Sequence, residues 1–353
     1  MTGHPLDATD VIAPNFKKRL SGVTATIVRL VPVQARDIAI RATGPVLPAH
    51  VPQVPLSALP TMSRRGPSGA RVWHARRNVE MIGGLALKYL LGKRLRLMFT
   101  SASQRQQSWL TRWLIRRMDA VVATSSRTAA YLQVPAQVVM HGIDTTDFTP
   151  PEDRAALRDR LGVPDAGPVF GCYGRIRAQK GTDAFVEAMI AVLRDRPDAA
   201  ALVMGRATDM HRAFEAGLRR KVEAAGLSDR LLFKPEVPTE AMADWYRVLD
   251  VYVAPQRWEG FGLTPIEAMA CGVPVVATRV GAFEDLVVPG ETGLLIDPDD
   301  VPAMTRACLE AVSDPARLDR WRAGSRAHVE ARFSLTAEAE ALNAIYRRLL
   351  APQ

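Results

Sequence analysis

The stretch VYVAPQRWEGFGLTPIEAMACGVPVVAT, residues Val251–Thr278, determines the expected fold. Its apolar run Val251–Ala254 ends at a proline, which predicts a short buried strand. After a Gly-Phe-Gly turn, Thr264 is a candidate helix N-cap and Pro265 falls at the first helical position. We therefore expect a strand, a glycine-containing loop and a helix in succession.

Two glutamates lie in this stretch, Glu259 on the loop and Glu267 in the first turn of the helix. A helix N-terminus offers unpaired N–H groups and a positive dipole end, which together favour an anion. Carboxylates beside such a site would bind hydroxyl groups attached to the anion, which suggests a nucleotide sugar. Alternatively, Thr264 and Glu267 form only a capping box, and Glu259 is an ordinary solvated glutamate.

The length of 353 residues exceeds one ordinary hydrophobic core, so two domains are expected. Strand-like and helix-like segments alternate on both sides of a polar, proline-containing segment, 145–152, which favours α/β domains with doubly wound parallel sheets. We place the domains at residues 1–150 and 151–334. The final helix, within residues 335–353, is expected to pack back on the first domain.

The composition is that of a soluble globular protein, with 48% apolar and 24% charged residues. Cys172, Cys271 and Cys308 are too few and too scattered for a disulfide framework or a zinc cluster, which favours a reducing compartment. The first ten residues lack the features of a signal peptide, and no uncharged apolar run reaches the roughly 18 residues of a membrane span. We expect a cytoplasmic protein. The Asp297–Asp299 segment precedes a helix and is interpreted as a cap and turn, so no metal site is expected.

Positive charge is concentrated in the first half of the chain. Residues 1–150 contain 20 Lys and Arg against 7 Asp and Glu, a net charge of +13, and the remainder carries −4. Nucleic acid, an anionic membrane surface and a phosphorylated acceptor all fit this excess. Trp109 and Trp113 fall at helical spacing beside arginines, as in an interfacial helix, although an amphipathic core helix would look the same. The absence of zinc-finger or RNP motifs disfavours nucleic acid.

Ligands of open α/β sheets bind at the carboxyl ends of the strands. In the first half, Lys17, Lys18 and Gly22 follow the first expected strand and could bind a phosphate or an acidic acceptor. His74 ends another expected strand that begins at Arg71. It is either a site residue or a buried structural histidine.

The second half contains a basic, glycine-bounded loop, GRIRAQKG at residues 174–181. Its Arg175 and Lys180 suit a diphosphate, since they supply charge where glycines allow close approach. The spacing is not that of a P-loop. Two further strand ends, Gly205-Arg206 and Lys234–Val237, are expected at the same edge of the sheet.

Four motifs follow one another along the chain: HGID at the linker, and then GRIRAQKGTD, FKPEVP and WEGFGLTPIEAMACGVPVVAT. Together they resemble the retaining family 4 nucleotide-sugar glycosyltransferases, which have the GT-B fold with two Rossmann-like domains facing a central cleft. In the first half, the segments APNFKKRLSGVT, VWHARRNVEM, FTSASQRQ and MHGIDT resemble the bacterial lipopolysaccharide core mannosyltransferases. Those enzymes use GDP-mannose and act on the Kdo of a lipid A precursor.

The resemblance implies roles for individual residues. Arg175 and Lys180 would bind the donor diphosphate, Glu267 the ribose hydroxyls, and Glu259 the hydroxyls of the transferred sugar. The donor site as a whole would comprise Gly22, Gly174, Arg175, Lys180, Gly205, Arg206, Lys234, Val237, Glu259, Gly262, Leu263, Thr264 and Glu267. The expected catalytic residues are Glu259, Arg175, Lys180 and His74.

The resemblance also implies a place and partners. We expect a metal-independent enzyme without a cofactor, whose nucleotide sugar, GDP-mannose, is a substrate. The other expected partners are an anionic glycolipid acceptor and the inner face of the cytoplasmic membrane, with no nucleic acid. Transfer is expected by front-side attack, with the departing diphosphate stabilised by Arg175, Lys180 and the helix N-terminus.

The chain departs from the family pattern at three places. Thr100 or Ser101 stands where many members have a strand-end histidine, and His141 replaces the usual asparagine at the linker. The usual Gly-Gly before the later glutamate is Gly281-Ala282 here, and Phe283 intervenes before that glutamate.

Three alternatives remain open from the sequence. The enzyme could use a UDP-sugar on another lipid or glycan acceptor. A basic nucleic-acid-binding module would explain the first half but not the motifs of the second. A Rossmann oxidoreductase would need a Gly-x-Gly-x-x-Gly turn after its first strand, and the chain has none.

Overall fold

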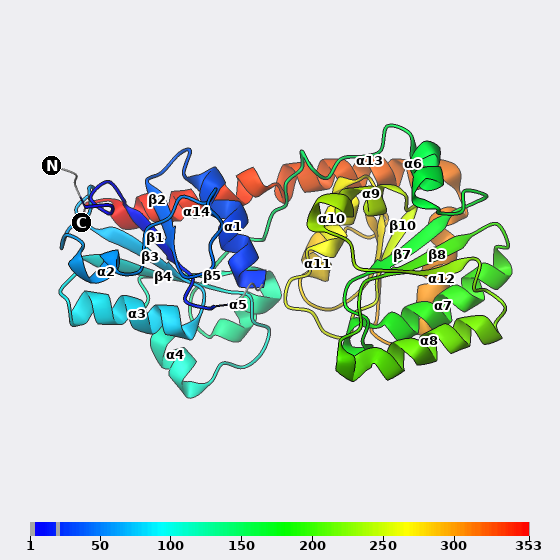
Figure 1. Cartoon of the computed structure of the whole chain (residues 1–353), viewed down its shortest axis with the longest axis horizontal. Helices are drawn as coiled ribbons and strands as arrows, with labels where there is room; N and C mark the ends of the chain where they lie inside the picture. The colour runs from blue at the N-terminus through cyan, green and yellow to red at the C-terminus, as the bar shows by residue number, and fades with distance from the viewer. Residues whose placement is uncertain (1–3, 19–21, 353) are drawn as a thin grey trace. The chain divides into compact units, whose positions relative to one another are not determined.

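The alternating apolar runs of the sequence form parallel strands in the computed structural model, which describes residues 4–18 and 22–352. The strands lie in two units, coloured from blue to red along the chain in Figure 1. Unit 1 comprises Met1–Gly142 and Leu335–Gln353, and unit 2 comprises Ile143–Ser334. The sequence places the boundary at residue 150, which is too late. Ile143 already belongs to unit 2, because its N–H donates to the Phe333 carbonyl at 2.9 Å.

Within the described residues, unit 1 is built on a six-stranded parallel sheet. In spatial order its strands are β2 (Ile40–Thr43), β1 (Val11–Pro14), β3 (Arg71–Ala75), β4 (Leu95–Ser101), β5 (Ala120–Ala123) and β6 (Gln137–Val138). Its helices are α1 (Gly22–Gln34), α2 (Ala58–Thr61), α3 (Asn78–Tyr89), α4 (Trp109–Ile115), α5 (Ser126–Leu132) and α14 (Leu335–Leu350). The helices cover both faces, as the doubly wound prediction requires.

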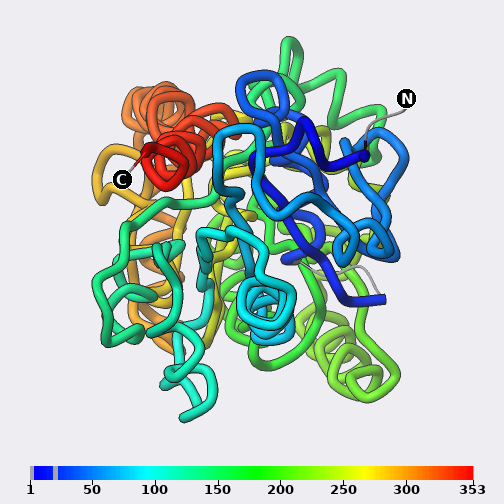
Figure 2. The backbone as a smooth tube through the Cα atoms, turned by 90° about the vertical axis from the view of Figure 1, so that its left-hand side faces the viewer, coloured from blue at the N-terminus to red at the C-terminus, as the bar shows by residue number. Residues whose placement is uncertain are grey.

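Two apolar cores lie on the two faces of this sheet. On one face α1 and α14 pack through residues such as Ile27 and Leu342. On the other, α3, α4 and α5 pack through residues such as Met81, Leu114 and Leu132. Figures 1 and 2 show α14 and α3 on opposite sides of the strands. Unit 1 therefore completes its core with a helix from the far end of the chain.

Polar contacts fix α14 to unit 1. Gln34 of α1 donates to Asn343 at 3.1 Å. Glu338 binds the chain just before the boundary: its carboxylate accepts the Gly142 N–H at 2.8 Å and lies 2.8 Å from His141 Nδ1. His141, which replaces the usual asparagine of the family, is therefore bound by Glu338 of α14.

Unit 2, again within the described residues, contains a second six-stranded parallel sheet. Its spatial order is β12 (Gly293–Ile296), β11 (Val275–Thr278), β10 (Val251–Ala254), β7 (Val169–Tyr173), β8 (Ala200–Met204) and β9 (Leu231–Lys234). Its α-helices are α6 (Arg154–Leu161), α7 (Thr182–Asp195), α8 (Arg212–Ala224), α9 (Met242–Arg247), α10 (Thr264–Ala270), α11 (Phe283–Leu286), α12 (Val301–Val312) and α13 (Pro315–Arg332), with 3₁₀ turns η1 (Ala178–Lys180), η2 (Asp209–His211) and η3 (Thr239–Ala241).

The four inner strands of unit 2 are almost wholly apolar because both faces of the sheet are covered. Every residue of β7, β8, β10 and β11 is buried. Helices α7, α8 and α12 contribute to the core on one face, with Phe185 and Met304 among its buried side chains. Parallel sheets between helices require such continuous apolar runs, which explains why β10 could be predicted at its observed bounds.

The strand order of unit 2 reverses between β7 and β10. The first strand, β7, pairs with β8 on one side and with β10 on the other. The connections that leave β7 and β10 therefore emerge next to each other. This is the position at which open α/β sheets bind their ligands.

One further feature of the helices concerns membranes. Among the residues that the structure describes, no helix is both long enough and apolar enough to span a bilayer.

The buried ion pair of Arg158 and Asp250 leads to a test of how unit 2 is held together. Arg158 Nη2 lies 2.7 Å from Asp250 Oδ2, and that oxygen also accepts the Val169 N–H at 2.8 Å. Asp250→Ala would leave a buried guanidinium without this partner, so we expect a loss of about 3–5 kcal/mol in the free energy of unfolding, measured by denaturant titration.

Asp165→Ala is the matched control. Asp165 also pairs with Arg158 at 2.7 Å, but its side chain is 46% exposed. Exposed ion pairs contribute about 1 kcal/mol or less. Equal destabilisation by the two variants would contradict the assignment of Asp250 as the essential partner.

Candidate functional site

The switch between β7 and β10 brings together two loops that the sequence places about eighty residues apart. The loop after β7 contains Arg175 and Lys180, and the loop after β10 contains Glu259. Lys180 lies at the end of η1, directly before α7. The buried apolar strands thus position the polar residues of the two loops.

Lys180 and Glu259 meet as an ion pair. Lys180 Nζ donates to Glu259 Oε2, and the other carboxylate oxygen, Oε1, accepts the Gly260 N–H at 3.0 Å. The side chains of Lys180 and Glu259 are 24% and 17% exposed, so both groups are partly shielded and still reachable from solvent. A cation suited to phosphate and a carboxylate suited to hydroxyl groups therefore lie side by side.

The backbone around Glu259 leaves no room for a side chain at Gly262. This residue has φ +88°, and a Cβ there would lie 2.4 Å from the Phe283 ring and 3.0 Å from Glu259 Cγ. Phe283 is fully buried. The phenylalanine that departs from the family pattern thus packs against the turn that carries Glu259.

Glu267 occupies the first turn of α10, as expected, but the predicted capping by Thr264 is wrong. The N-cap residue is Leu263, and no side chain caps the helix. Thr264 is the first residue of α10 rather than its cap. Tyr246 donates its hydroxyl to Glu267 Oε2 at 2.8 Å, and burial followed by this carboxylate raises the pKa of Tyr246 well above its ordinary value. Tyr246 therefore acts as a fixed donor that orients Glu267.

Gly174 and Arg175 lie directly beyond β7, and both are exposed. Arg175 forms no ion pair with any residue that the structure describes. The Gly174 N–H donates to the Met204 carbonyl at 2.9 Å and the Gly205 N–H to the Lys234 carbonyl at 3.2 Å. The ends of β7, β8 and β9 are thus joined through their main chains.

The remaining residues predicted for this edge have other partners. Arg206 pairs with Glu236 at 3.3 Å, and both side chains are largely exposed. Lys234 donates to the Gly162 carbonyl at 3.2 Å and lies 5.6 Å from the centre of the Trp245 ring. Val237 is partly buried in the segment after β9. None of these three contacts the Lys180–Glu259 pair.

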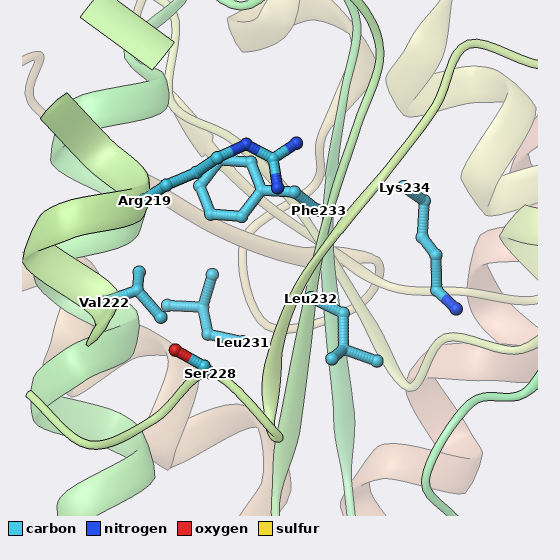
Figure 3. A pocket seen from close by; sticks show the side chains of 7 residues that line it. All are labelled: Arg219, Val222, Ser228, Leu231, Leu232, Phe233 and Lys234. Carbon is cyan, nitrogen blue, oxygen red and sulfur yellow. The ribbon is translucent and has the colours of Figure 1, made fainter. Parts of the chain in front are cut away.

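A hollow of about 270 Å³ lies beside the edge strand β9 (Figure 3). The Arg219 guanidinium stacks on the Phe233 ring at 4.4 Å there, whereas Lys234 projects from the other side of the strand. The lining residues are Arg219, Val222, Ser228, Leu231, Leu232, Phe233 and Lys234. Of the residues expected in the donor site, Lys234 lines this hollow, whereas Lys180 and Glu259 do not.

His74, which the sequence proposes as a catalytic residue, is completely buried in unit 1. Its Nδ1 lies 2.6 Å from the Tyr346 hydroxyl and its Nε2 lies 2.7 Å from Thr100 Oγ1. Burial, followed by the nearby Arg76 guanidinium, lowers the pKa of His74 well below its ordinary value. The ring therefore links β3, β4 and α14, and this geometry favours the structural alternative for His74.

The first-half phosphate candidate is only partly described. Gly22 is the first residue of α1, and Lys17 and Lys18 are exposed after β1. Residues 19–21 of the same loop lie outside the described residues.

Two residues of the site were not identified from the sequence. Tyr246 lies on α9, and no motif marks it. Arg257 stands in the quoted loop two positions before Glu259 and pairs with Asp183 and Asp299. Two signals could have suggested this pairing: Arg257 directly precedes the WEGFGL motif, and Asp183 follows Lys180 in the GRIRAQKGTD motif. Within the described residues there is no cluster of His, Cys, Asp and Glu suited to a metal ion. The cap of α12 is Asp300, one residue after the Asp297–Asp299 segment in which it was expected.

Comparison with known proteins places this arrangement in a family. A family model described as glycosyl transferases group 1 matches residues 153–328, which contain both loops. The lipopolysaccharide core biosynthesis mannosyltransferase LpsB of Rhizobium meliloti (strain 1021) is 54% identical over 97% of this chain and 98% of that protein. LpcC of Rhizobium leguminosarum bv. viciae, with the same description, is 48% identical over 97% of each.

Solved structures show the same fold across the full length. HepE from Anabaena, crystallised with UDP, superimposes with a TM-score of 0.82 over 96% of this chain and 100% of that chain, at 17% identity. The two-sheet GT-B architecture expected from the motifs is thereby confirmed. The 54% identity to LpsB, over nearly the full length of both chains, and the match to the family model together show that this chain is an enzyme belonging to the group 1 glycosyl transferases.

Proposed function

We propose that this enzyme is a retaining mannosyltransferase that transfers mannose from GDP-mannose to the Kdo inner core of a lipid A precursor in lipopolysaccharide biosynthesis. The observation that carries the proposal is the Lys180–Glu259 pair at the sheet switch point. Two lipopolysaccharide core mannosyltransferases, 54% and 48% identical to this chain over nearly its full length, also support the proposal. The UDP bound to HepE indicates nothing about the donor of this chain, since only the fold is shared.

In this proposal, the diphosphate of the donor replaces Glu259 as the partner of Lys180. A Lys ammonium beside a diphosphate gains more from two negative charges than from one carboxylate. Glu259 is then free to accept hydrogen bonds from hydroxyl groups of the sugar. The unliganded ion pair thus keeps both side chains in place until the donor arrives.

Bond cleavage adds about one unit of negative charge to the departing nucleoside diphosphate, which already carries about two. Arg175 and Lys180 are the cations of unit 2 that can stabilise it. The acceptor hydroxyl attacks the anomeric carbon on the face that the diphosphate leaves, and its proton passes to the departing phosphate oxygen. Glu267, oriented by Tyr246, binds the ribose hydroxyls and so fixes the nucleotide. In this scheme protein cations supply the charge that Mg²⁺ provides in other transferases.

A donor screen followed by a transfer assay tests the proposal. We expect calorimetry to show binding of GDP-mannose, and transfer of mannose to a Kdo-bearing lipid A precursor with the anomeric configuration retained. Binding of UDP-sugars alone would overturn the choice of donor while leaving the family assignment intact. Inversion at the anomeric carbon, observed by NMR, would overturn the retaining mechanism.

The two cations of the loop after β7 generate a second prediction. Arg175→Ala or Lys180→Ala should lower kcat by about 10²–10³ or more, because each variant removes a charge that stabilises the leaving group. Circular dichroism and thermal unfolding should show an intact fold. Lys221→Ala is the matched control, since Lys221 forms an exposed pair with Glu187 in the same unit. Near-normal turnover in either site variant would refute the diphosphate assignment.

We also propose that unit 1 binds the inner face of the cytoplasmic membrane through a face formed by α3 and α4. Asn78 of α3 donates to Thr111 of α4 at 2.8 Å, which holds the two helices together. The apolar side chains exposed on or next to these helices are Val79, Ile82, Tyr89, Leu90, Leu91, Trp109, Leu110 and Trp113. We call this set the α3–α4 face.

The charge around the α3–α4 face favours an anionic bilayer as its occupant. Arg94, Arg116 and Arg117 are exposed next to it, and Arg117 stacks on Trp113 at 3.5 Å. Exposed aromatic and aliphatic side chains beside arginines suit the boundary between headgroups and acyl chains. Each basic residue near an anionic surface adds about 1 kcal/mol of attraction. An enzyme whose proposed acceptor is a membrane lipid requires such a surface.

Vesicle sedimentation tests the α3–α4 face. The protein should bind vesicles that contain anionic lipid, more weakly as salt is raised, and the double variant Leu90→Ser with Trp109→Ser should bind about tenfold or more weakly. These residues are 82% and 71% exposed, so the fold should survive. Met210→Ser, at an 87% exposed residue of unit 2, is the control. Unchanged binding by the double variant would exclude this face.

A further inference from the structure

Arg257 joins the two loops of the candidate site and has no role in the mechanism above. Its Nη1 and Nη2 lie 2.7 Å and 3.0 Å from the two carboxylate oxygens of Asp183, and its Nε lies 2.6 Å from Asp299 Oδ1. Nη1 also donates to the Ala178 carbonyl. The guanidinium thus uses donors on all three of its nitrogens.

The partners of Arg257 come from segments that follow different strands. Ala178 belongs to η1 and Asp183 to the first turn of α7, both after β7. Asp299 follows β12, directly before the N-cap of α12. The main chain adds a further link, because the Arg257 N–H donates to the Gln179 carbonyl at 3.1 Å. Arg257 therefore connects its own loop to the residues on either side of Lys180.

The two loops also touch through their backbones at Gly181. This residue has φ +69°, and a Cβ there would lie only 1.8 Å from the Pro255 carbonyl oxygen. Only glycine permits this approach. Lys180 is consequently flanked by contacts to the other loop, at Gln179 on one side and at Gly181 on the other.

The geometry that Arg257 imposes matters more than its contribution to stability. The side chains of Arg257 and Asp183 are 30% and 26% exposed, and ion pairs with this exposure stabilise a fold only modestly. Catalysis is more sensitive, because a misplacement of about 1 Å can reduce turnover about 100-fold. Arg257 lies two residues from Glu259 and contacts the turn that ends in Lys180.

We propose that Arg257 is a positioning residue, which sets the placement of Lys180 relative to Glu259 so that one group meets the diphosphate while the other meets the sugar. The role in transfer rests on the proposed function, whereas the effect on the loop after β7 does not. Lysine cannot substitute, since one ammonium nitrogen cannot bind both oxygens of Asp183 together with Asp299 and a carbonyl.

The first experiment follows backbone hydrogen exchange in the full-length protein without ligand. The amides of Lys180 and Gly181 are hydrogen-bonded within η1, to the carbonyls of Arg177 and Ala178, so their exchange reports opening of this turn. Arg257→Ala should accelerate exchange of a peptide covering 178–183 by about tenfold or more, with β8 and α8 unchanged. Arg196→Ala is the matched control, because Arg196 forms an equally exposed bidentate pair with Asp198 in the same unit.

The second experiment is a double-mutant cycle between Arg257 and Lys180, with GDP affinity measured by calorimetry and kcat by the transfer assay. Arg257→Ala should weaken GDP binding about tenfold and lower kcat about 100-fold. In a Lys180→Ala background the same change should have almost no further effect, because Arg257 acts through Lys180. Arg257→Lys should behave like Arg257→Ala.

The proposal would be overturned by unchanged exchange in 178–183, by independent losses in the cycle, or by restoration of activity in Arg257→Lys. A uniform rise in exchange throughout unit 2 would assign Arg257 a purely stabilising role and would also overturn it. If GDP fails to bind the unmodified protein, the donor assignment fails, UDP replaces GDP in the cycle, and the exchange experiment still decides the effect on the loop.

Discussion

The pairing of β7 with β10 is the constraint on which the site depends. β7 is the first strand of its sheet in sequence and lies in the middle of it in space. The loops after β7 and β10 therefore leave the same edge in neighbouring positions, and the Lys180–Glu259 contact follows from that topology. Burial of the apolar strands stabilises the sheet that places the two loops side by side. The opposite charges of Lys180 and Glu259 then attract each other in the absence of ligand.

Close packing between loops makes the site rigid at particular points. Gly181 touches the Pro255 carbonyl, Gly262 lies against Phe283, and Arg257 binds Asp183. Each contact restricts the backbone on either side of a functional side chain. The chemistry of transfer depends on such placement, because the interactions that stabilise a transition state act only over short distances.

Unit 1 uses its polar residues differently. His74, Tyr346 and Thr100 form a buried network that attaches α14 to the sheet, so the histidine at the strand end contributes to the fold. Most of the large apolar side chains that unit 1 exposes among its described residues lie instead on and around α3 and α4. The loops that follow the strands of unit 2 thus carry charged groups of the site, whereas His74, near the end of a strand of unit 1, makes structural contacts.

The sequence by itself determined the alternation of strands and helices, the family and the two loops, because continuous apolar runs, glycines and motif spacing are local properties. Tertiary structure alone decided which polar groups meet. A capping box of Thr264 and Glu267 was expected from local spacing, yet Leu263 is the N-cap residue and Glu267 accepts a hydrogen bond from Tyr246. The burial of His74 and the contacts of Arg257 likewise depend on partners distant in the chain. Side-chain contacts between separate elements arise from packing, and no short sequence pattern encodes them.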